Sequence, residues 1–340
     1  MNKWWLIGGL SVLIWACNDE PKSDNVKEVS EGVQVEQVVD SIDILNEMIK
    51  KEPKNASLYA QKARIYLTQQ QSDLAIEEYE RAIKADTTDP TYYLKKAEVF
   101  FNRAQFDKSR KETERVLAFA PENAQANLRM AWIAFVVKGY EKSLEYINEA
   151  LKADVHLAEA YYLKGLVYKD TEKYKMAVSS FRTATEQDNN YYEAWVELGY
   201  LHGLANSDLT TSYYDNAIRI DSTKYEAHYN KGFFLQERGR YREALDEYDV
   251  IIRNKPYFYN AYYNKGFIYL EYLEKYDSAA YEFTRVIGVN PMNFKAFYNR
   301  GLAYERDGED KKALQDYEEA LKLKPTFDLA AEGKSRVLGN

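Results

Sequence analysis

The sequence predicts an all-α fold: an α-solenoid of about eight helix–turn–helix repeats with capping helices at its ends. Three observations predict it. Apolar residues recur at spacings of three and four, which place them on one face of a helix. The pattern returns every 34 residues along most of the chain. Five of the 7 prolines fall at the same position of that repeat, where a helix must end because proline cannot continue it.

The stretch 225–258 shows the repeat most clearly. With Tyr225 as position 1, small, apolar or aromatic residues stand at positions 4, 8 and 11 of the first half and at 17, 20, 21, 24, 27 and 28 of the second. Gly239 separates the halves, and Pro256 closes the second. Each half alone would leave an apolar face in water, so the halves must pack on each other and on neighbouring repeats.

Small residues recur where two helices would cross. A close crossing needs a short side chain on each helix. Position 8 is alanine or glycine in every repeat: Ala63, Ala97, Ala131, Gly165, Gly199, Gly232, Gly266 and Gly301. Position 24 is bulky in most repeats, as in Tyr79, Phe181 and Tyr248. The alternation predicts rings packed against the small residues.

This register resembles the tetratricopeptide repeat family, whose signature is a 34-residue helix–turn–helix with the same spacing. The resemblance implies a superhelix of repeats. We assign repeats 1 to 8 to 56–89, 90–123, 124–157, 158–191, 192–224, 225–258, 259–293 and 294–327. A half-repeat helix within 38–55 and a helix within 328–340 are expected to cap the ends, since a terminal repeat otherwise exposes an apolar face.

One departure from the family is systematic. Position 7, usually leucine, is a cation in six repeats: Lys62, Lys96, Lys164, Lys231, Lys265 and Arg300. We expect the aliphatic stems to be buried and the charges to reach the surface.

Residues 1–17 predict a lipoprotein signal peptide. Lys3 precedes an apolar run from Trp4 to Ala16, which has the length of a secretory signal and is shorter than the roughly 20 residues of a transmembrane helix. The run ends at Cys17, the one cysteine. Residues 13–17 resemble a bacterial lipobox, which implies lipid attachment at Cys17. An ordinary signal peptide and an uncleaved anchor remain alternatives.

Residues 18–37 are polar, acidic and without periodicity, so they predict a flexible tether. We therefore expect an exported lipoprotein that is anchored in the outer membrane. The sequence does not distinguish the periplasmic face of that membrane from the surface face.

Composition and motifs argue against several classes of function. The net charge of −8 disfavours nucleic acid, which needs basic patches. Metalloprotease, CxxC, nucleophile-elbow and phosphate-loop motifs are not found. The 3 histidines lie in different repeats, and two, His202 and His228, occupy positions that favour core packing. We expect no enzyme activity, no cofactor and no metal.

The remaining candidate is a binding surface. The resemblance implies that positions 2, 5, 6, 9, 12 and 13 of the first helices line a concave groove. Its expected aromatic and amide residues are Trp132, Tyr162, Tyr200, Tyr229, Asn230, Phe233, Tyr263, Asn264, Phe267, Tyr298 and Asn299. Its expected acidic residues are Glu193, Glu197, Glu226, Glu237 and Glu271.

These residue types suit a peptide. Aromatic rings supply contact area at low entropic cost, and an asparagine amide can both donate to and accept from a peptide backbone. Acidic walls attract cationic segments. We therefore predict a non-catalytic, lipid-anchored scaffold that binds an extended, basic segment of a protein partner. A surface glycan- or nutrient-binding lipoprotein is the alternative, although the insertions of at most one residue between repeats disfavour it. Ring packing and a solvated acidic face are the plainer explanations of the same residues.

Overall fold

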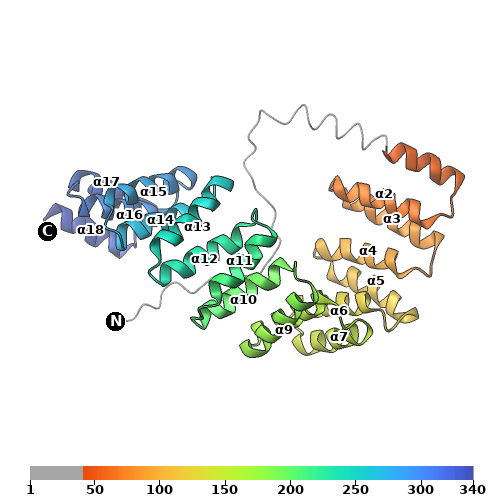
Figure 1. Cartoon of the computed structure of the whole chain (residues 1–340). Helices are drawn as coiled ribbons and strands as arrows, with labels where there is room; N and C mark the ends of the chain where they lie inside the picture. Colours follow the sequence, from red (N-terminus) through yellow and green to blue (C-terminus); the bar gives the residue numbers. More distant parts are fainter. Residues whose placement is uncertain (1–40, 340) are drawn as a thin grey trace. The chain divides into compact units, whose positions relative to one another are not determined.

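The computed structural model describes residues 41–339 (Figure 1). The predicted signal peptide, Cys17, the tether and residues 38–40 lie outside the described residues. Every regular element between 41 and 339 is a helix, which confirms the predicted all-α fold. The chain falls into two compact units, one ending at Gln105 and the other beginning at Phe106.

The first unit contains a helix over 41–51 and then α2 (Ala56–Thr68), α3 (Ser72–Ala85) and α4 (Pro90–Asn102). Helices α2 and α3 pack as a hairpin. Ala63 and Ala75, at positions 8 and 20, are fully buried beside Tyr79, as the spacing predicts. Helix α4 starts at Pro90 because its fixed φ suits the first helical position, and Asp89 caps the helix by accepting a hydrogen bond from the Thr91 N–H at 2.8 Å.

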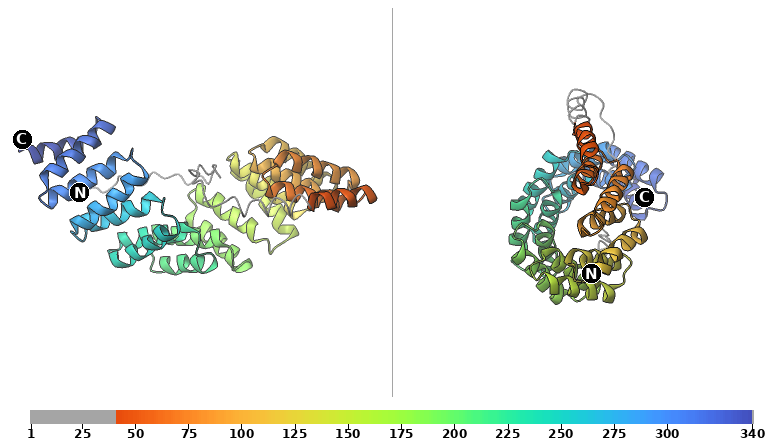
Figure 2. Two further views of the ribbon diagram at one scale, coloured as in Figure 1. Left: turned by 90° about the horizontal axis from the view of Figure 1, so that it is seen from above. Right: turned by 90° about the vertical axis from the view of Figure 1, so that its right-hand side faces the viewer.

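The second unit stacks successive hairpins side by side, as can be followed in Figures 1 and 2. Its helices are α5 (Phe106–Phe119), α6 (Ala124–Val136), α7 (Tyr140–Ala153), α8 (Ala158–Asp170), α9 (Tyr174–Gln187), α10 (Tyr192–Leu204), α11 (Thr210–Ile220), α12 (Tyr225–Glu237), α13 (Tyr241–Asn254), α14 (Tyr259–Glu271), α15 (Tyr276–Val289), α16 (Phe294–Arg306), α17 (Asp310–Leu323) and α18 (Asp328–Leu338). Helix α18 packs on α17 and α16 at the end of the array.

Glycine at position 8 is required by the ring opposite it. A Cβ added to Gly165 would lie 2.5 Å from Cδ1 of Phe181, and one added to Gly199 would lie 2.6 Å from the Tyr214 ring. Phe181 is completely buried, so its ring cannot move away into solvent. The predicted close crossing of the two helices is therefore present in repeats 4 and 5.

Candidate functional site

The first-helix face is the surface formed by positions 2, 6, 9 and 13 of α8, α10, α12 and α14, the first helices of repeats 4 to 7. Helix α12 contacts both α10 and α14 directly, so residues at these positions on neighbouring helices lie near one another. The predicted site residues of this region are considered below in groups.

The aromatic residues divide into packed and exposed rings. Tyr162 is buried between Phe181 and Tyr191, with ring centroids 5.6 and 5.0 Å apart, so it belongs to the core and offers a partner little surface. Burial raises its pKa far above the usual range of a phenol. Tyr200 and Phe233 are 41% and 43% exposed and are therefore available for contact.

The other predicted rings are partly buried against neighbours. Tyr229 meets Phe258 edge to face at 5.5 Å, and Tyr263 meets Phe283 in the same way at 5.5 Å. The remaining members of this group also pack within the chain: Tyr298 lies 5.2 Å from Phe327, Phe267 lies 5.9 Å from Tyr272, and the Trp132 indole N–H donates to Glu159 at 2.8 Å.

Two of the three predicted asparagines already bind tyrosines of the preceding repeat. The Asn264 amide nitrogen donates to the Tyr229 hydroxyl at 3.3 Å and to the Tyr248 hydroxyl at 3.1 Å. The Asn299 amide nitrogen donates to the Tyr263 hydroxyl at 2.9 Å. The donors that the sequence suggested for a peptide backbone are thus used to join one repeat to the next.

The predicted acidic residues also divide into two sets. Three of them are paired: Glu193 with Lys224 at 2.9 Å, Glu197 with Lys169 at 2.6 Å and Glu271 with Arg306 at 3.0 Å. Glu226 and Glu237 are exposed and form no ion pair with any residue between 41 and 339. Carboxylates that form no ion pair within 41–339 thus stand at both ends of α12, and Glu159 and Asp170 of α8 likewise form none there.

The cations at position 7 differ from the sequence prediction. Lys265 is 8% exposed, and its Nζ lies 2.5 Å from Asp249 and 2.9 Å from Glu282. Lys62 is likewise buried and pairs with Glu78 at 2.9 Å. The expectation that these charges reach the surface is wrong for Lys62, Lys96 and Lys265, which are buried. For Lys62 and Lys265 the cause is the carboxylates at positions 23 and 25 of the second helices, which pair with the ammonium groups.

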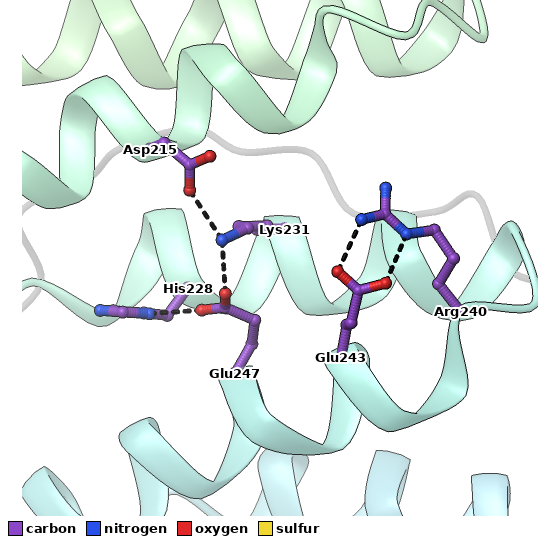
Figure 3. A network of polar contacts seen from close by, with 6 residues as sticks. All are labelled: Asp215, His228, Lys231, Arg240, Glu243 and Glu247. Carbon is purple, nitrogen blue, oxygen red and sulfur yellow. Dashed lines mark hydrogen bonds and ion pairs between the residues drawn. The ribbon is translucent and has the colours of Figure 1, made fainter.

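Repeat 6 extends this arrangement into a network (Figure 3). Glu247 on α13 binds His228 Nδ1 and Lys231 Nζ of α12, both at 2.6 Å, and Lys231 also pairs with Asp215 of α11 at 2.7 Å. Burial opposes the charge on Glu247, but the hydrogen bonds from His228 and Lys231 overcome it and lower the pKa of the carboxyl group. The network joins three helices, which supports the core role predicted for His228.

The other histidines do not join this network. His202 lies 4.6 Å from the Tyr213 ring, and burial lowers its pKa. His156 Nδ1 contacts Gln187 at 2.7 Å. No two histidines contact each other within 41–339, so they do not form a shared site there.

One group of carboxylates could approach a cation. Oxygens of Asp277, Asp307 and Glu309 lie within 4.8 Å of one another. Lys312 already pairs with Glu309, and both aspartates are exposed, so a solvated acidic surface explains the group. In the described part of the chain, no helix combines the length and the apolar character needed to cross a bilayer.

Comparison with known proteins agrees with the fold. Tetratricopeptide repeat models match residues 56–89 and 158–191, residues 213–246 and residues 294–327. Three of these segments coincide with repeats 1, 4 and 8, and the match at 213–246 begins within α11, the second helix of repeat 5.

Solved structures show the same architecture. The C-terminal part of a repeat-containing protein from Cytophaga hutchinsonii is similar over 71% of this chain and 98% of its own, with a TM-score of 0.61 and 15% identity. A chain of the Cut9–Hcn1 hetero-tetramer of the APC/C is similar over 87% of this chain and 58% of its own, with a TM-score of 0.51 and 15% identity. At these identities the likeness concerns the fold alone.

Two fungal proteins are similar in sequence over shorter stretches. Anaphase-promoting complex subunit 3 of Schizosaccharomyces pombe is 32% identical over 111 residues, which are 32% of this chain and 17% of that protein. Protein bimA of Emericella nidulans is 29% identical over 85 residues, which are 25% of this chain and 10% of that protein. The matched stretches thus span less than a fifth of either relative.

Folds of this kind generally act as scaffolds for protein–protein interaction and are generally not catalytic. The 34-residue register, the paired helices and the matching repeat models together show that the chain belongs to the tetratricopeptide repeat family.

Proposed function

We propose that this protein is a non-catalytic, lipid-anchored scaffold that binds an extended segment of a protein partner on the first-helix face of repeats 4 to 7. The observation that supports binding there is the pair of exposed rings, Tyr200 on α10 and Phe233 on α12, beside two unpaired carboxylates. Most other aromatic residues of the face are buried against their own chain. Aromatic side chains, tyrosine among them, are enriched in binding hot spots and lose water when a partner covers them.

The exposed rings provide the test of the binding face. The full chain is used as bait with membrane extracts, and any captured partner is then titrated against variants. We expect Tyr200→Ala and Phe233→Ala each to weaken binding by about 1–2 kcal/mol or more. Each side chain is more than half buried, so each truncation should also cost about 0.5–3 kcal/mol of stability, and affinity is compared on folded protein.

A matched control is Tyr281→Ala, which removes a ring that is 59% exposed on α15, a second helix and therefore not part of the first-helix face. Its affinity should equal that of the unmodified chain. If all three substitutions leave the affinity unchanged, the partner binds elsewhere and this assignment is wrong.

The anchor requires a separate test. Cys17→Ser removes the one thiol that a lipoprotein signal could modify. We expect the substituted protein to lose acyl labelling and to move from membrane to soluble fractions. A wild-type protein that takes up no acyl label, together with a variant that stays in the membrane fraction, would contradict lipid anchoring while leaving the binding face unaffected.

A further inference from the structure

The Asn230 side chain lacks the tyrosine partner that the corresponding asparagines of repeats 7 and 8 have at position 5 of the preceding repeat. In repeats 7 and 8, the position-6 asparagine donates to a tyrosine hydroxyl at position 5 of the repeat before it. The equivalent position before Asn230 is Val196, which has no hydroxyl. The Asn230 amide accordingly forms no side-chain hydrogen bond with any residue of 41–339 and keeps both donor and acceptor atoms available.

Three other side chains, all exposed, lie on the same face of α12 as Asn230. Glu226, Asn230, Phe233 and Glu237 are spaced by four, three and four residues, which aligns them along one side of the helix. Both glutamates are exposed, and Phe233 is exposed on the same line. Glu226 also lines a surface hollow together with Tyr225, Asn254 and two lysines, Lys224 and Lys255, neither of which pairs with it.

The neighbouring first helices differ from α12. On α10, Glu193 and Glu197 are neutralised by Lys224 and Lys169. On α14, Glu271 is neutralised by Arg306, and the amide of Asn264 is occupied. Unpaired negative charge, a free amide and an exposed ring therefore coincide on α12 among the helices of this face.

We propose that the α12 face binds a segment of the partner in which two cationic side chains flank an apolar one. The inference rests on the function proposed above and specifies the chemistry of the bound segment. Each glutamate would pair with one cation, Phe233 would contact the apolar residue between them, and the Asn230 amide would bind a backbone peptide group. The charges are complementary, so acidic residues at either end of the segment would oppose binding.

The helix geometry also sets the spacing of the two cations. Glu226 and Glu237 are eleven residues apart, and an α-helix rises 1.5 Å per residue, so their backbone positions are about 16 Å apart. An extended chain advances about 3.3 Å per residue. The two cationic residues should therefore stand about five residues apart in the segment.

Synthetic peptides test this spacing on the full chain. The probe is a series of labelled twelve-residue peptides with two lysines separated by three, five or seven positions, a leucine between them and glycine or serine elsewhere. We expect affinity to be highest near a separation of five and to fall with added salt. The same peptides with glutamate in place of lysine should not bind.

Substitutions on α12 test which carboxylates take part. Glu226→Gln and Glu237→Gln should each lower the affinity for the best lysine peptide about two- to fivefold, the range expected for exposed ion pairs. The control is Asp246→Asn, which removes an exposed carboxylate of α13 that forms no ion pair within 41–339 and does not belong to the first-helix face.

A change at Val196 tests the amide without altering any charge. Val196→Tyr would supply the hydroxyl that tyrosines supply in repeats 6 and 7 and should engage Asn230, lowering peptide affinity about two- to tenfold, as for a lost hydrogen bond. Val196→Phe adds the same ring without the hydroxyl and should bind peptide more tightly than Val196→Tyr. Equal affinity of these two variants would show that the Asn230 amide takes no part.

The outcomes separate this inference from the proposed function. Peptide affinity that ignores lysine spacing and both glutamine substitutions overturns the inference. If Tyr200→Ala and Phe233→Ala still weaken a captured partner in that case, the binding face stands and only the two-cation segment is wrong. If none of these changes alters the affinity for the peptides or for a captured partner, both the binding face and the two-cation segment are wrong.

Discussion

Lys265→Met is expected to lower the free energy of unfolding by about 3–5 kcal/mol, the range for breaking a buried ion pair by removing one partner. Methionine nearly preserves the volume of the side chain, so the loss comes from charge. Glu282 is 5% exposed, and its Oε2 already lacks a hydrogen-bond partner, so it would remain buried and ionised without compensation. Chemical denaturation of the full chain, with the repeat array fitted as coupled units, provides the measurement.

Lys164→Met is the matched control. Lys164 occupies position 7 of repeat 4, but the positions that supply carboxylates elsewhere hold Ser180 and Asn148, and the lysine forms no ion pair within 41–339. Its replacement should cost less than about 1 kcal/mol. Equal losses from the two substitutions would contradict a role for the paired carboxylates.

The pH dependence of Lys265→Met follows from Glu282. Burial raises the pKa of this carboxyl above 4.5, and the Lys265 hydrogen bond opposes that rise. Without Lys265 the pKa of Glu282 in the folded state should rise further. A raised carboxyl pKa destabilises the folded state at pH values above it and ceases to do so once the group is protonated in both states. The difference in free energy of unfolding between Lys265→Met and the wild type should therefore become smaller as the pH falls towards 4.5.

Phe181→Ala is expected to cost about 3–5 kcal/mol, the range for truncating a fully buried aromatic side chain. The Phe181 ring is packed against Gly165 and Tyr162, and it has no exposed surface. Because each repeat contacts only its neighbours, hydrogen-exchange protection should fall first in repeat 4 and the repeats beside it. Tyr257→Ala removes a ring of similar size from the surface and should change stability by less than about 0.5 kcal/mol. Uniform loss of protection along the chain would argue against a modular array.

A double-mutant cycle with Gly165→Ala tests the same contact. Alone, Gly165→Ala should cost about 1–3 kcal/mol, because its Cβ would overlap the Phe181 ring. In the Phe181→Ala background the overlap is gone, and alanine should stabilise the helix by up to about 1 kcal/mol relative to glycine. The effect of Gly165→Ala should therefore change sign. An unchanged sign would show that the ring does not enforce the glycine.

The period of the array and the positions of its helices follow from sequence alone. Each repeat combines an apolar stripe with a small residue at position 8, and local spacing determines both features. The sequence did not predict the backbone geometry of the turns. Gly239 marks one turn with φ of +73°, but Lys138 and Glu172 adopt φ of +61° and +59° at the equivalent place in other repeats. Packing of the two helices imposes a left-handed backbone conformation at this position even where the residue is not glycine.

The candidate face was predicted only in part. The register assigned Tyr200, Phe233 and Tyr162 alike to the groove, but the rings of Tyr200 and Phe233 are exposed whereas that of Tyr162 is buried. Tyr162 is covered by Phe181 and Tyr191 of its own repeat, so whether such a ring meets solvent depends on how the hairpin packs.

What the sequence by itself determined is which residues lie on each face of each helix, because a 3.6-residue period depends only on local spacing. What only the tertiary structure decided is which polar groups satisfy one another across helices. Lys265 and the Asn264 amide both find partners in the preceding repeat, whereas Asn230 does not. A hydrogen bond needs its partner within about 3 Å, and the offset between two packed helices that sets this distance is a property of the folded array.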